Sequence, residues 1–153
     1  MVTAFPLLLV SLAVSLQAAS DASVCDQGWA SFSGQCYRYF REMKSWAEAE
    51  IHCLSLGGHM ASVHSSDDNQ FVTSLIKGQA SSDRPTWLGA TKCEETPAWL
   101  WTDGSEWHFS NWYSREPNNR HGVEKCLQVN FRVPGSWNDI NCASRLPFVC
   151  VKD

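Results

Sequence analysis

The stretch SWAEAEIHCLSLGG, residues 45–58, contains a complete helix with both of its ends. Ser45 is followed three residues later by Glu48, which forms a capping box, a pair of side chains that each bind a backbone N–H at a helix start. Apolar residues then recur at helical spacing, at Trp46, Ala49 and Cys53. The glycine pair 57–58 predicts the end of this helix.

A second helix is predicted over SSDDNQFVTSLIKG, residues 65–78. Ser65 with Asp68 opens it, and the two acidic residues at 67–68 suit the positive end of the helix dipole. Its apolar stripe consists of Phe71, Val72, Leu75 and Ile76. Gly78 is predicted to end the helix.

After residue 78 the pattern changes from helical spacing to short strands bounded by Gly, Pro, Asn and Asp. Strands are predicted at residues 86–92, 99–105, 125–131 and 147–152, with one early strand at 36–40. Helices that precede strands in this way indicate an α+β fold with short antiparallel sheets. A long polar stretch at 107–125 has no periodicity, and long ordered loops of this kind are usually functional.

The N-terminus carries an uncharged apolar run at residues 5–16, followed by small residues at 18–22. This layout predicts a secretory signal peptide over residues 1–20, cleaved between 18 and 22. An N-terminal anchor is the alternative, but the run is short for a membrane span. Residues 21–153 then form one domain, in which no further segment is apolar enough to cross a membrane.

Cysteine content and charge narrow the class of protein further. All seven cysteines follow the predicted signal peptide, at positions 25, 36, 53, 93, 126, 142 and 150. Export combined with this cysteine density indicates disulfides. The net charge is −4 and the basic residues are scattered, which argues against a nucleic-acid partner.

The candidate binding site begins in REPNNRHGVEKC, residues 115–126, which on composition alone can equally be a solvated loop. If Cys126 is bridged to Cys142, this loop meets the motif WND, residues 137–139, on one rim. The side chains gathered there offer only oxygen, and are Glu116, Asn118, Glu124, Asn138 and Asp139. Such a set suits calcium, whereas zinc favours His or Cys, and the histidines show no metal spacing.

Several short motifs together resemble the C-type lectin domain family through their order and spacing. They are CYRYF (36–40), SWAEAEIHC (45–53), GGHMASVHS (57–65), WLG (87–89), NW (111–112), EPN (116–118), WND (137–139) and FVC (148–150). The resemblance extends over the whole predicted mature chain. It implies a C-type lectin-like fold, with two helices packed on short antiparallel sheets and a long calcium-binding loop.

The same resemblance implies a cysteine pairing that the sequence alone leaves open. The pairs are Cys25–Cys36, Cys53–Cys150 and Cys126–Cys142, so that Cys93 is left over. An odd cysteine in a secreted protein often finds a partner, which favours an interchain disulfide in a homodimer over a buried free thiol.

The resemblance also assigns a role to the loop. In this family EPN marks sites similar to those of mannose-binding members, and QPD marks galactose binders. It implies one calcium held by Glu116, Asn118, Glu124, Asn138 and Asp139, with a cis peptide bond before Pro117. The expected ligands are glycans with vicinal equatorial hydroxyls, namely mannose, N-acetylglucosamine, glucose or the equivalent hydroxyls of fucose. Asn119 and Lys125 stand where some relatives carry aspartates for a second calcium, so one calcium is expected.

The predicted function is therefore a secreted, single-domain, fish-type lectin that recognises or agglutinates microbes in innate immunity. The alternatives are an ice-binding protein similar to fish type II antifreeze proteins, or a galactose-binding or protein-binding member of the same fold. An enzyme is disfavoured: a glycosidase pair needs a raised pKa in an apolar pocket, whereas bound calcium lowers the pKa of both glutamates. The chain also has no HExxH or GxSxG motif.

Overall fold

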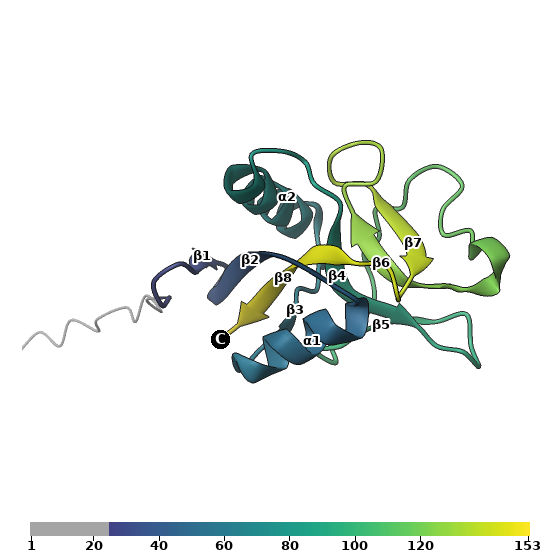
Figure 1. Cartoon of the computed structure of the whole chain (residues 1–153), viewed down its shortest axis with the longest axis horizontal. Coiled ribbons are helices and arrows are strands. Elements are labelled where there is room, and N and C mark those ends of the chain that lie inside the picture. The colour runs from purple at the N-terminus through teal and green to yellow at the C-terminus, as the bar shows by residue number, and fades with distance from the viewer. Residues whose placement is uncertain (1–24) are drawn as a thin grey trace, which may run out of the picture.

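The computed structural model describes residues 25–153, and the predicted signal peptide lies outside this range. The described chain has an α+β architecture, as expected, with its helices early and most of its strands late (Figure 1). The elements are β1 (Ala30–Phe32), β2 (Gln35–Lys44), α1 (Trp46–Ser55), β3 (His59–Met60), α2 (Ser66–Ala80), β4 (Thr86–Lys92), β5 (Trp99–Trp101), the 3-10 helix η1 (Arg120–Gly122), β6 (Glu124–Val129), β7 (Trp137–Asn141) and β8 (Leu146–Lys152).

The strands form one sheet in the order β1-β2-β8-β4-β6-β7, with β3 paired to β8 and β5 paired to β4. All pairs are antiparallel except β4 with β8, which run parallel at Trp87 and Phe148. The expected antiparallel sheet therefore includes this one parallel pair. A parallel pair needs a long connection, and β5, β6 and β7 all lie between β4 and β8 in the chain.

Helix α1 begins as predicted. The Ser45 hydroxyl accepts a hydrogen bond from Glu48 N at 3.3 Å, and the Glu48 carboxylate accepts one from Ser45 N at 2.9 Å. The two helices lie on opposite sides of β2 and β8 (Figure 1). The predicted apolar residues of α2 contribute to the core.

Helix α2 does not end at Gly78, as the sequence pattern predicts, but continues to Ala80. The chain leaves the helix at Ser81, which has a left-handed backbone with φ of 59°. A glycine inside a helix costs only about 1 kcal/mol. The two added residues bring Ala80 against the core.

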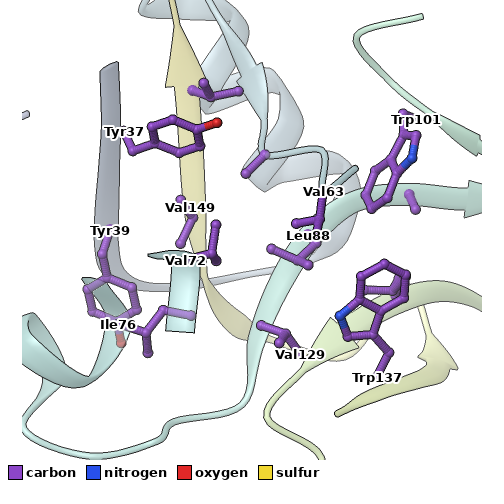
Figure 2. Close-up of a cluster of buried hydrophobic side chains, with 14 of the residues drawn as sticks. Tyr37, Tyr39, Val63, Val72, Ile76, Leu88, Trp101, Val129, Trp137 and Val149 are labelled. Atoms are coloured by element: carbon purple, nitrogen blue, oxygen red, sulfur yellow. The ribbon is translucent and has the colours of Figure 1, made fainter. Parts of the chain in front are cut away.

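Two apolar clusters fill the interior on the two sides of the sheet. The larger contains Tyr37, Val72, Ile76 and Leu88 together with a tryptophan group. Figure 2 shows Tyr37 and Tyr39 at one end of this cluster and Trp101 and Trp137 at the other. The tryptophan end lies under the long loop that follows β5, so the core directly supports that loop.

Three disulfides hold the fold together, and their pairing is the expected one: Cys25–Cys36, Cys53–Cys150 and Cys126–Cys142. The second pair joins α1 to β8 inside the smaller cluster, where both cysteines are fully buried. Cys93 is a free, partly exposed thiol. Within the described residues, no helix has the length and apolar character needed to cross a membrane.

Candidate functional site

The candidate site lies where the long loop between β5 and β6 crosses the β6–β7 hairpin. In this hairpin Leu127 pairs with Asp139 and Gln128 with Asn138, while Glu124 stands opposite Asn141. The Cys126–Cys142 disulfide ties the two strands together at the loop end. The motif WND therefore lies on a strand beside the loop, and not on a loop of its own.

The loop rests on a layer of tryptophans. Trp112 forms a parallel bridge with Trp137, and backbone hydrogen bonds flank it, from Tyr113 N to Trp137 O and from Trp137 N to Asn111 O, each 2.9 Å. The indole N–H of Trp137 donates to Asn69 Oδ1 at 2.9 Å, which links β7 to α2. These contacts fix the part of the loop that precedes EPN.

Asp139 is the buried centre of the site, with no exposed surface. Its carboxylate accepts hydrogen bonds from Asn118 N at 3.1 Å and from Asn119 N at 2.7 Å. Asn119 has a left-handed backbone with φ of 44°, a conformation that asparagine tolerates better than most residues. The peptide bond between Glu116 and Pro117 is cis. Asp139 thus holds the EPN segment against β7.

The two glutamates complete a continuous hydrogen-bond network around Asp139. The carboxylate of Glu116 accepts from both the backbone N and the side-chain amide of Asn118, each at 3.1 Å. The carboxylate of Glu124 accepts from Arg120 N at 2.8 Å. Four of the five predicted ligands, Glu116, Asn118, Glu124 and Asp139, are therefore brought together.

Asn138 is the predicted ligand that lies apart from this network. It is buried, and its amide N donates to Gln128 Oε1 on the neighbouring strand at 3.4 Å. Gln128 was not a sequence-based candidate, because a polar residue within a strand gives no sign of its cross-strand partner. Asn119 was considered only as a departure from the second calcium site, yet its Oδ1 accepts from Glu124 N at 3.2 Å.

Burial, together with the neighbouring Asp139 carboxylate, raises the pKa of two glutamates in the site. Burial, and then the nearby Asp139 carboxylate, raise the pKa of Glu116 to about 7. Burial also raises the pKa of Glu124, with Asp139 adding to the shift and the Arg120 backbone opposing it. In the protein without a cation, the pKa values of both glutamates are therefore raised, whereas bound calcium would lower them.

Within residues 25–153, no three carboxylate, imidazole or thiolate side chains form a preassembled metal cluster. The hydrogen bonds explain why, since Asp139 and Glu124 are directed at loop amides. The donor chemistry nevertheless fits calcium, because all five predicted ligands offer oxygen and a divalent cation would relieve the repulsion that raises the pKa of Glu116. A cation entering here must displace some of these amide hydrogen bonds.

Comparisons with known proteins agree with this description. Residues 42–152 match the family described as the lectin C-type domain. The lactose-binding lectin l-2 of Anguilla japonica is 41% identical over 131 residues, which cover 83% of this chain and 77% of that protein. The solved structure of the C-type lectin CEL-I from Cucumaria echinata gives a TM-score of 0.79 at 26% identity, over 83% of this chain and 96% of that one.

A calcium-dependent type II antifreeze protein, solved in its calcium-free form, has a TM-score of 0.77 at 31% identity and covers 84% of this chain and 100% of that chain. The expected C-type lectin-like fold is confirmed by these structures. The match to the lectin C-type domain and the lectin relatives agree with the expectation that the protein is not an enzyme. The chain belongs to the C-type lectin domain family.

Proposed function

We propose that the protein is a secreted, calcium-dependent lectin that binds mannose-type sugars through Glu116, Asn118, Glu124, Asn138 and Asp139. The observation that carries the proposal is the gathering of Glu116, Asn118 and Glu124 in one hydrogen-bond network around the buried carboxylate of Asp139. Secretion rests on the N-terminal apolar run and on the three disulfides, which persist in oxidising compartments.

The chemistry follows from the hydrogen-bonding capacity of these side chains. Bound calcium would supply coordination positions for the oxygens of two vicinal hydroxyls. The carboxylates of Glu116 and Glu124 accept hydrogen bonds from those hydroxyls, and the amides of Asn118 and Asn138 donate to them. To donate to a sugar hydroxyl, the Asn138 amide must first release its hydrogen bond to Gln128. The carboxylate-before-amide order of EPN favours equatorial hydroxyl pairs, which galactose lacks at its axial 4-hydroxyl.

Two alternatives are favoured by specific relatives. The lactose-binding lectin of Anguilla japonica supports a galactose-type specificity, and the structural likeness to an antifreeze protein supports ice binding. The EPN order in this chain is the feature that favours mannose over both. Microbial surface glycans are the natural ligands we propose.

Retention on mannan-agarose tests the proposal against these alternatives. We expect retention in calcium and release by a chelator or by free mannose. Release by galactose alone would establish the galactose-type alternative. No retention, combined with thermal hysteresis of the purified protein, would establish ice binding.

Cys93 is proposed to link two copies of the chain. It lies in the turn between β4 and β5, is partly exposed and is outside the three intrachain disulfides. A dimer would present two shallow sugar sites, and such multivalency strengthens weak binding. Non-reducing electrophoresis should show a dimer that Cys93→Ser abolishes, and a wild-type band at monomer size only would reject this link.

A further inference from the structure

A cationic platform borders the candidate sugar site on the side of the β6–β7 turn. It consists of the rings of Tyr113 and Phe131 and the guanidinium of Arg132. The two rings meet edge to face, with centroids 5.5 Å apart. The guanidinium carbon of Arg132 lies 5.2 Å from the centre of the Phe131 ring and 5.9 Å from that of Tyr113. The charge is therefore held over two aromatic faces, a favourable cation–π arrangement.

The backbone also fixes Arg132. Val133 N donates to Phe131 O at 2.7 Å, which closes a tight turn with Arg132 at its apex. Arg132 has a φ of 62°, a left-handed conformation that is uncommon for a residue other than glycine. The turn is anchored in the hairpin by a hydrogen bond of 3.0 Å from Phe131 N to Ser136 O. The arginine is thus positioned by both its backbone and its side chain.

The platform is joined directly to the candidate site. Tyr113 O accepts a hydrogen bond of 2.9 Å from Glu116 N. This contact makes residues 113–116 a β-turn, whose end Cα atoms lie within about 7 Å of each other. Ser136, which anchors the turn, is two residues before Asn138. A sugar bound at Glu116 and Asn138 would therefore lie beside the platform, which a neighbouring unit of the glycan could contact.

The positive charge of Arg132 is not compensated within the described residues. Arg132 is exposed, and among residues 25–153 it makes no ion pair and donates no side-chain hydrogen bond. A guanidinium presents a planar fork of donors that matches carboxylate, sulfate and phosphate oxygens.

We propose that Arg132, held by Tyr113 and Phe131, binds an anionic substituent on the glycan, next to the sugar held by the EPN site. This inference rests on the proposed function, because it places the anionic group relative to a mannose-type sugar at Glu116 and Asn138. It narrows the ligand class to acidic glycans, in which the oxyanion is a carboxylate, a sulfate ester or a phosphate.

Calorimetric titrations with four ligands test the proposal and separate the three oxyanions. The ligands are a neutral α-mannoside disaccharide and the same disaccharide carrying, on its second unit, a carboxylate, a sulfate ester or a phosphomonoester. In calcium, we expect the wild type to bind at least one anionic form about fivefold more tightly than the neutral form. The preference should weaken as salt is raised.

Arg132→Gln should bind the neutral and the anionic ligands equally, since it keeps a polar side chain and loses the positive charge. The matched control is Arg145→Gln, which also removes one exposed arginine but from the pair with Glu48, and should retain the preference. Calcium-induced thermal stabilisation of each variant verifies that it is folded.

The possible failures are distinguishable. Equal affinity of the wild type for neutral and anionic ligands, or a preference that survives in Arg132→Gln, would overturn the inference and leave the proposed function intact. Failure of the wild type to bind any of the four mannosides in calcium would overturn the proposed function and this inference together.

Discussion

Replacing Glu116 with glutamine should change stability in opposite directions with and without calcium. The pKa of Glu116 rises from an ordinary 4.5 to about 7, because of burial and the nearby Asp139. A shift of that size corresponds to roughly 3 kcal/mol against the ionised form. The side chain is partly open to solvent, and screening reduces this to about 1 kcal/mol. Glutamine keeps an oxygen for one of the two Asn118 hydrogen bonds, and it removes the cost of burying a charge beside Asp139.

In chelator at pH 8, Glu116→Gln should therefore be more stable than the wild type by about 1 kcal/mol, a rise in Tm of roughly 3–5 °C. The raised pKa belongs to the folded state, so its destabilising effect is full above pH 7 and disappears as the pH falls towards 4.5. The advantage of the variant should disappear over the same range.

In calcium the order should reverse, because the variant lacks one ligand carboxylate. At a calcium concentration 100 times the Kd, the wild type should gain about 2.7 kcal/mol from binding. The variant should gain much less. Thermal unfolding in chelator and in calcium, at pH 8 and pH 5, measures all four conditions. A variant that is less stable in chelator at pH 8, yet keeps the full calcium response, would refute the reasoning.

Three further predictions concern the same architecture. The calcium concentration needed for half-saturation, measured by tryptophan fluorescence, should rise as the pH falls from 8 to 6. The reason is that protons compete with calcium at Glu116, whose pKa is about 7. A half-saturating concentration that stays constant down to pH 5 would contradict this. Removing the Cys53–Cys150 disulfide, which spans 97 residues, should lower the free energy of unfolding in denaturant by about 4–5 kcal/mol. Removing Cys25–Cys36, which spans 11 residues, should lower it by about 3 kcal/mol. Equal losses would count against the loop-entropy argument. Trp137→Phe leaves the Asn69 side-chain oxygen without its buried donor and should cost about 1–3 kcal/mol, so a loss under about 0.5 kcal/mol would mean that this contact is not stabilising.

Local signals account for the parts of the fold that the sequence predicts well. The capping box at Ser45 and Glu48 forms as expected, and the strand predicted at residues 86–92 has the same bounds in β4. In contrast, the strand predicted at 99–105 stops at Trp101, because the chain turns there into the long loop. Strands β1, β3 and β7 were not predicted, since each is too short, or too polar in the case of WND, to show an alternating pattern.

The candidate site also has a part that the sequence predicts and a part that it does not. The identity of its side chains is readable from EPN and WND, because a motif specifies chemistry by residue type and order. Their hydrogen bonds are not readable, since they depend on how the loop folds against β7. Asp139 accepts loop amides rather than pointing outward, and Asn138 pairs with Gln128 across the hairpin. The raised pKa of Glu116 follows from this same packing.

The central claim is that calcium and a mannose-type sugar share one site at Glu116, Asn118, Glu124, Asn138 and Asp139. Calorimetric titration of methyl α-mannoside into the wild-type protein, in calcium and then in chelator, tests it most directly. We expect saturable binding in calcium, none in chelator, and none for methyl α-galactoside in either. Mannoside binding that persists in chelator, or tighter binding of the galactoside, would contradict the account.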